Sequence, residues 1–149
     1  MTVLYIAVFF GVKMIKKIDG IVLEDEKEEK KAENAAPDPL AEKFLKTRQI
    51  LLSGEICEEL AEKIIRQLLI LEADNDKPIY IYIDSPGGDV YAGFAIFDTI
   101  RFINAPVYII GTGLIASAAA LILLSVPKER RLGLPHSSYL IHQPSSGMK

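Results

Sequence analysis

One short stretch constrains the fold of this chain most: an apolar run at 79–83 that stops at Ser85-Pro86-Gly87-Gly88. The run is short, β-branched and aromatic, which predicts a buried strand. Proline fixes φ and glycine accepts backbone angles that other residues resist, so a sharp turn is expected next. Helical spacing follows at Val90, Phe94, Phe97 and Ile100. Taken alone this is a tight βα connection, but such a turn also leaves N–H groups free at a helix start, where negative charge is stabilised.

The composition is that of one globular domain. Half of the 149 residues are hydrophobic and a quarter are charged. The net charge of −3, with no basic stripe interleaved with aromatics, gives no indication of nucleic-acid binding. The single Cys57 excludes an internal disulfide framework and fits a reducing compartment, which predicts a cytoplasmic location. Cys57 and the two histidines lie far apart, so no metal site is expected. The chain has no Walker A motif and no complete G-x-G-x-x-G, so we expect no ATP site and no cofactor in it.

The first forty residues differ from the rest. Residues 1–10 are almost wholly apolar, which is too few to span a bilayer, so no membrane segment is expected. The mixed-charge run 24–31 and the proline-punctuated 35–39 are typical of a solvated linker. We therefore expect an N-terminal arm and charged linker over 1–40 and a compact domain over 41–149. Natural translation from Met14 is an alternative for the start.

The compact part alternates helical and strand patterns. Helices are expected at 40–47, at 58–73 and from 90 to Ile103, and strands at 49–53, 79–83 and 107–111. Strands that are apolar throughout, joined by helices, predict an α/β fold: βαβ repeats forming a mostly parallel sheet with helices on both faces. Sites in such sheets lie at the carboxyl ends of the strands, where the Gly87-Gly88 turn falls.

A second motif follows the strand at 107–111. A glycine-containing turn leads to an apolar helix expected over 116–124, with Ser117 at its start. The simplest interpretation of Ser117 is a helix cap. The functional alternative is a nucleophile on a strand–turn–helix junction with small neighbours, a geometry that α/β-hydrolases reach with a different motif.

A serine nucleophile needs a base and an oxyanion hole. His142 lies at the end of a short apolar strand, whereas its rival His136 falls in the turn before that strand. We therefore favour His142 as the base. The amides of Gly88 and Ala118 are candidates for the oxyanion hole, and each such donor can be worth about 3 kcal/mol in the transition state.

Three motifs together carry a resemblance to a known family: Ser85-Pro86-Gly87-Gly88, Ala116-Ser117 and Ile141-His142-Gln143-Pro144. In these motifs and their spacing, from about Phe44 to Gly147, the chain closely resembles the proteolytic subunit of Clp protease (ClpP, peptidase family S14). The segments Phe97-Asp98-Thr99-Ile100 and Leu134-Pro135-His136-Ser137 also match that family.

The resemblance implies a ClpP/crotonase fold and an ATP-dependent serine endopeptidase. Ser117 would be the nucleophile, His142 the general base and Gly88 and Ala118 the oxyanion amides, with Gly87 in the turn beside the substrate groove. It also implies two stacked seven-membered rings, homo- or hetero-oligomeric, that cut unfolded proteins to short peptides. A partner AAA+ Clp unfoldase would use the ATP.

Three departures from the family stand out. Ala118 stands where the family usually has methionine or another larger residue, and the N-terminal arm is longer than usual. The family's triad aspartate and its long handle helix lie beyond the histidine, whereas this sequence ends at Lys149 and has no aspartate after Asp98. We therefore expect a C-terminally truncated member, in which loss of the aspartate can lower kcat about 10⁴-fold.

Two alternatives stay open. One is a non-catalytic structural subunit of a mixed Clp ring, because some relatives keep the fold and lose the triad. The other is a crotonase-type acyl-CoA enzyme, which shares the superfamily and its amide oxyanion hole but needs no serine–histidine pair.

Overall fold

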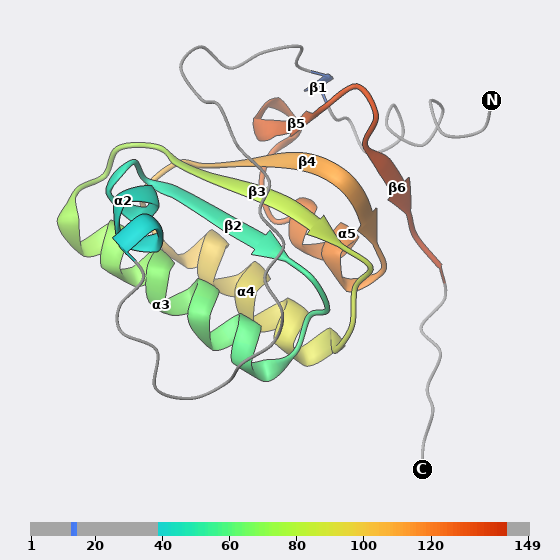
Figure 1. Cartoon of the computed structure of the whole chain (residues 1–149), viewed down its shortest axis with the longest axis horizontal. Coiled ribbons are helices and arrows are strands. Elements are labelled where there is room, and N and C mark those ends of the chain that lie inside the picture. Colours follow the sequence, from blue (N-terminus) through green and yellow to red (C-terminus); the bar gives the residue numbers. More distant parts are fainter. Residues whose placement is uncertain (1–12, 15–38, 143–149) are drawn as a thin grey trace.

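The structure of the protein is a computed structural model, and it describes residues 13–14 and 39–142 (Figure 1). Its elements follow in this order: β1 (Lys13–Met14), α2 (Pro39–Lys46), β2 (Gln49–Ser53), α3 (Glu58–Asp74), β3 (Ile79–Ser85), α4 (Val90–Phe102), β4 (Val107–Ala116), α5 (Ala118–Leu123), the 3₁₀ helix η1 (Lys128–Arg130), β5 (Arg131–Gly133) and β6 (Ser138–Leu140). The predicted arm and linker, 1–40, lie outside the described residues except for Lys13, Met14, Pro39 and Leu40.

The strands form one sheet in the order β1-β5-β4-β3-β2, and β6 pairs with the second half of β4. Every pairing is parallel. The predicted α/β fold with a parallel sheet and βαβ repeats is therefore confirmed. Because parallel strands finish at the same edge of a sheet, the turn after β3 and the residues after β4 come out close together (Figure 1).

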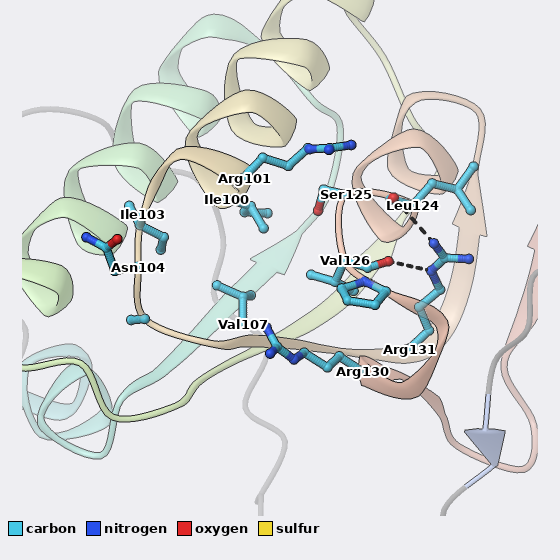
Figure 2. A pocket seen from close by; sticks show the side chains of 12 residues that line it. Ile100, Arg101, Ile103, Asn104, Val107, Leu124, Ser125, Val126, Arg130 and Arg131 are labelled. Carbon is cyan, nitrogen blue, oxygen red and sulfur yellow. Dashed lines mark hydrogen bonds between the residues drawn. The ribbon is translucent and has the colours of Figure 1, made fainter.

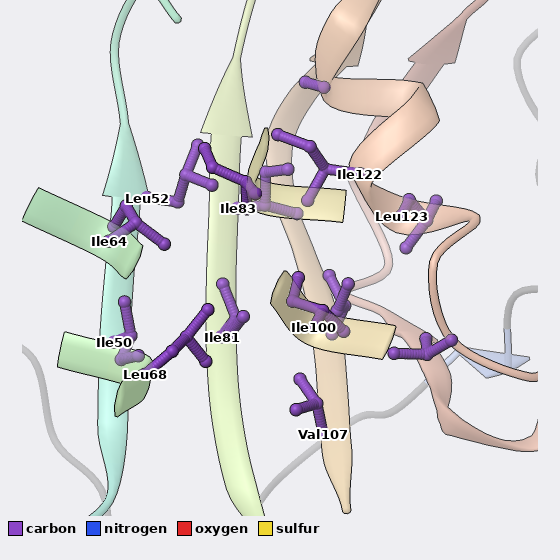
Figure 3. Packing of buried hydrophobic residues seen from close by; sticks show 14 of the residues in the cluster. Ile50, Leu52, Ile64, Leu68, Ile81, Ile83, Ile100, Val107, Ile122 and Leu123 are labelled. Carbon is purple, nitrogen blue, oxygen red and sulfur yellow. The ribbon is translucent and has the colours of Figure 1, made fainter. Parts of the chain in front are cut away.

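The core lies between the sheet and the helices α3, α4 and α5. Ile50 and Leu52 of β2 are fully buried, whereas Leu51 between them is 52 % exposed, so one face of this strand is covered. Figure 3 shows strand residues of that covered face packed against side chains of α3, α4 and α5. Among the described helices, α3, α4 and α5 lie side by side on this face, and helices on the opposite face stay a prediction.

On the opposite face of the sheet Tyr82 and Ile110 are buried, and further aromatic residues lie beside them. Tyr80 and Tyr108 stack there with ring centroids 5.3 Å apart and are only half-buried. A tyrosine side chain pairs a large apolar body with a polar tip, so it tolerates partial exposure. An apolar run that contains tyrosines therefore does not require a second layer of helices.

The strand β4 extends five residues beyond its expected end at Gly111. Glycines at 111 and 113 indicated a turn, but the strand continues to Ala116 through an irregularity in its pairing with β3. The helix α5 consequently starts at Ala118 instead of 116. Over the described residues, no helix is long and apolar enough to cross a membrane.

Candidate active site

The turn after β3 depends on its two glycines. Gly87 and Gly88 have φ values of 97° and 148°, which other residues rarely adopt. The loop after β2 holds this turn from behind, because Ile56 N donates to Gly87 O (2.8 Å) and Asp89 N donates to Ile56 O (2.8 Å). A Cβ on Gly88 would lie 2.2 Å from Ile56 O, so only glycine fits.

Two side chains complete the turn. The buried Ser85 accepts a hydrogen bond from Gly87 N (3.1 Å), and Asp89 caps α4 by accepting from Ala92 N (2.7 Å). An N-cap of this kind satisfies one of the free N–H groups at a helix start. The turn is therefore fixed at both ends, by the sheet and by the helix.

Ser117 joins β4 to α5 in a strained conformation, with φ 54° and ψ −121°. Of the described non-glycine residues, only Arg48 shares a positive φ. Such angles cost about 1–3 kcal/mol and tend to occur at functional sites. Ser117 occupies the N-cap position of α5, but its side chain makes no capping hydrogen bond. This geometry speaks against the helix-cap interpretation and favours a nucleophile.

The glycine turn and Ser117 are in direct contact. A Cβ on Gly87 would lie 2.6 Å from the Ser117 Cβ and 2.7 Å from Ala116 O. The lack of a side chain at Gly87 therefore lets β3 and β4 approach closely at the point where both end. A carbonyl group of a substrate placed above Ser117 would lie beside this turn.

The amides of Gly88 and Ala118 are both free of hydrogen bonds within the described structure. The groups on either side of Gly88 bond Ile56, so the N–H of Gly88 faces the opposite way. The N–H of Ala118 belongs to the first turn of α5 and has no acceptor within that helix. The arrangement thus presents two unsatisfied donors on either side of the contact between Gly87 and Ser117, as an oxyanion hole requires.

The strand β6 carries the predicted base toward Ser117. Ser117 N donates to Leu140 O (2.9 Å), and β6 runs parallel to 114–116 of β4. His142 follows two residues after Leu140, on the side where β4 ends, whereas His136 precedes β6 and lies toward its opposite end. The direction of β6 therefore favours His142 over His136. The catalytic roles of Ser117, His142, Gly87, Gly88 and Ala118 stay predictions.

Tyr139 anchors β6, a role that no sequence pattern indicated. Its side chain is buried, and its hydroxyl lies 2.8 Å from Ser137 Oγ. Burial raises the pKa of Tyr139, and the hydrogen bond with Ser137 partly offsets that effect. Gly111 makes room for the ring, because a Cβ there would lie 2.5 Å from the Tyr139 hydroxyl.

The described aspartates near the site are engaged elsewhere. Asp84 Oδ1 accepts from Leu114 N (2.9 Å), and Asp89 caps α4. These hydrogen bonds do not place either aspartate as the partner of His142. The part of the chain that the structure describes also contains no group of three or more His, Cys, Asp or Glu residues suited to a metal ion.

Two pockets lie away from Ser117. The first, of about 440 Å³, is lined by the ends of α4 and α5 and by η1 (Figure 2). There Arg131 donates to Val126 O (2.8 Å) and Leu124 O (3.5 Å), so its guanidinium caps the carboxyl end of α5. The second, of about 660 Å³, is an apolar groove between α2, β2 and α3. Neither pocket includes a predicted catalytic residue.

Comparison with known proteins agrees with this geometry. The family model described as Clp protease matches residues 30–149. The chain is 67 % identical over 123 residues to the ATP-dependent Clp protease proteolytic subunit 2 of Treponema denticola, covering 82 % of this chain and 62 % of that protein. It is 58 % identical over 127 residues to the subunit 2 of Treponema pallidum, covering 84 % and 64 %.

The solved structures give a similar result. The structure of ClpP1 from Listeria monocytogenes superimposes with a TM-score of 0.70 and 47 % identity, covering 74 % of this chain and 65 % of that one. The chain therefore spans less than two thirds of the length of these relatives.

Proposed function

Because the chain belongs to the Clp protease family, we propose that it is a proteolytic subunit whose Ser117 hydrolyses peptide bonds of unfolded proteins. The observation that carries this proposal is the strained Ser117, packed against Gly87 with the free amides of Gly88 and Ala118 nearby. Ser117 is partly exposed, and a nucleophile needs an accessible hydroxyl next to donors for the developing negative charge.

The reaction follows from these groups. His142 removes the proton of the Ser117 hydroxyl as Oγ attacks the peptide carbonyl carbon. The carbonyl oxygen becomes an oxyanion and accepts hydrogen bonds from the amides of Gly88 and Ala118. The imidazolium then protonates the leaving amine, the C–N bond breaks and an ester to Ser117 forms. Water, deprotonated by His142, hydrolyses the ester and restores both residues.

Assembly and partners belong to the same proposal. We propose that the subunit works in seven-membered rings and that an AAA+ Clp unfoldase supplies unfolded substrate in the cytoplasm. The ATP would be used by that partner, so this chain needs no cofactor of its own. Large apolar side chains on the described surface support a role in assembly, because exposed apolar patches often mark interaction sites; they include Leu51, Leu69, Ile70 and Phe102.

A fluorophosphonate probe tests the proposed nucleophile. The probe should modify Ser117 of the 149-residue chain, with the modified residue identified by mass spectrometry, and Ser117→Ala should abolish the labelling. Labelling of another serine would contradict the assignment of Ser117. No labelling of the chain, alone or with added Clp subunits, would favour the alternative of a non-catalytic ring subunit.

A matched variant tests the base. His142→Ala should lower the labelling rate by a factor of at least about 10², since general-base assistance contributes about 10²–10⁴. His136→Ala is the control and should label at the parent rate. The reverse order of the two effects would assign the base to His136.

A further inference from the structure

The irregularity in β4 sets where the nucleophile emerges. Ile83 of β3 pairs with Gly111 of β4, and the next pair is Ser85 with Ile115. Two steps along β3 (83 to 85) therefore correspond to four steps along β4 (111 to 115). Residues 112–114 form a bulge immediately before the candidate site, and bulges of this kind redirect the residues that follow them.

The bulge changes which residue of the turn after β3 lies level with Ser117. With an uninterrupted register, Ser85 would pair with Gly113 and Ser117 would come level with Asp89. The two additional residues bring Ser117 level with Gly87 instead, which agrees with the close approach of their Cα–Cβ regions. The difference amounts to about 7 Å along the strand, at ~3.3 Å per residue.

A single carboxylate holds this bulge. Asp84, the β3 residue opposite it, accepts the hydrogen bond from Leu114 N at 2.9 Å. Its carboxylate also fills the space above Gly113, where a Cβ would lie 2.6 Å from Asp84 Oδ1, and the φ of Gly113 is 64°. Thr112 adds a weaker bond from its hydroxyl to Ile83 O at 3.2 Å. The backbone of Asp84 is itself fixed, because its carbonyl accepts from Gly54 N (3.1 Å).

We infer that Asp84 is a positioning residue for both Ser117 and the strand that leads to His142. Its bond fixes Leu114, and 114–116 are the residues that pair with β6. The hydrogen bond from Leu114 N to Asp84 therefore helps to set the exit point of the nucleophile and, through β6, the approach of the base. This inference rests on the proposed function for the roles of Ser117 and His142, but the placement of the Ser117 backbone can be tested without activity.

Three variants separate the hydrogen bond from the charge. Asp84→Ala removes the acceptor, Asp84→Asn keeps an oxygen of the same shape without the charge, and Asp76→Ala removes an exposed loop carboxylate as the control. We expect Asp84→Ala to lower the rate of fluorophosphonate labelling at Ser117 by about tenfold or more, the size of one bond to a charged group. Asp84→Asn should stay within about threefold of the parent, since it retains the bond, and Asp76→Ala should match the parent. Equal losses for the alanine and asparagine variants, or none for alanine, would overturn the inference.

Amide hydrogen exchange gives the second readout, which does not need a working enzyme. Asp84→Ala should speed exchange at the amides of Leu114 and Ser117, while the amide of Ile81 in the middle of β3 keeps its protection. Asp84→Ser, whose hydroxyl is too short to reach Leu114 N, replaces the alanine variant if that one fails to fold. Unchanged exchange at Ser117 would overturn the inference. If the parent does not label, yet the exchange pattern appears, the proposed function fails and the positioning by Asp84 stands.

Discussion

The side chain at position 87 controls how closely the glycine turn approaches the nucleophile. In Gly87→Ala the new methyl group would meet the Ser117 Cβ and Ala116 O, neither of which can move without shifting the backbone. We expect labelling of Ser117 to fall at least about tenfold, because overpacking costs about 1–3 kcal/mol. Gly54→Ala is the matched comparison: its φ of 90° is equally unfavourable for alanine and nothing lies within 4 Å of the new Cβ, but Gly54 N also donates to Asp84 O (3.1 Å), so a smaller loss of labelling is expected there.

Both variants should lose stability, and Gly87→Ala should lose clearly more labelling than Gly54→Ala. Thermal unfolding followed by circular dichroism measures the first effect and mass spectrometry the second. A loss of labelling in Gly54→Ala as large as in Gly87→Ala would mean that backbone strain, and not contact with Ser117, governs reactivity.

The sequence predicted the residues of this site that belong to local motifs and missed those that act from a distance. Ser117, Gly87 and Gly88 stand at the ends of apolar strands, where glycine and small residues interrupt the pattern. Asp84 directly follows the apolar run 79–83, but nothing in that run indicates its contact, and Ile56 stands in no such pattern. Their contacts, to Leu114 and to the glycine turn, exist only once three strands are paired, so no local rule reveals them.

At the scale of an element, Arg48 is likewise a residue whose contacts no local sequence pattern indicates. It follows α2 with a φ of 60°, is 8 % exposed and donates to Leu71 O (3.0 Å), Asn75 O (2.9 Å) and Lys77 O (2.7 Å). These are the last carbonyls of α3 and those of the loop that leads to β3. A helix end needs such partners for its free carbonyl groups, and a planar guanidinium can reach several at once.

We expect Arg48→Lys to destabilise the fold by about 2–4 kcal/mol, since a single ammonium cannot replace the fork and loses several of its hydrogen bonds to the carbonyls of Leu71, Asn75 and Lys77. Arg66→Lys is the control, because Arg66 pairs with Glu62 on the exposed face of α3 and such a pair contributes at most about 1 kcal/mol. Urea unfolding of both variants measures the difference. Equal effects would mean that the buried hydrogen bonds of Arg48 add nothing beyond a surface charge.

At the scale of strands, the fold class was predictable and the ends of elements were less so. The periodic apolar runs of β2, β3 and α3 identified those elements nearly to the residue. The continuation of β4 beyond Gly111 was not predicted, because the ladder with β6 depends on a segment twenty-four residues away, with Leu114 opposite Ser138.

Alkaline pH should destabilise the whole molecule through two tyrosines. Burial raises the pKa of Tyr139 and, together with a smaller effect of Tyr80, that of Tyr82. The raised pKa values mean that the folded state favours the neutral phenol. Below the unfolded tyrosine pKa of about 10, the contribution of the two phenols to folding stability is therefore complete. It is lost as pH rises from there through the folded pKa values. Tm should fall above about pH 10 more steeply in the parent than in the double variant Tyr82→Phe/Tyr139→Phe.

The quantity to compare between variants is the slope of Tm against pH, because lysine deprotonation affects every variant in the same pH range. Tyr139→Phe also loses the hydrogen bond with Ser137, which lowers Tm at all pH values without changing its pH dependence. Tyr91→Phe is the control, since Tyr91 is 84 % exposed and should leave the slope unchanged. If the double variant loses Tm between pH 9 and pH 11 as steeply as the parent, the buried phenols do not limit alkaline stability.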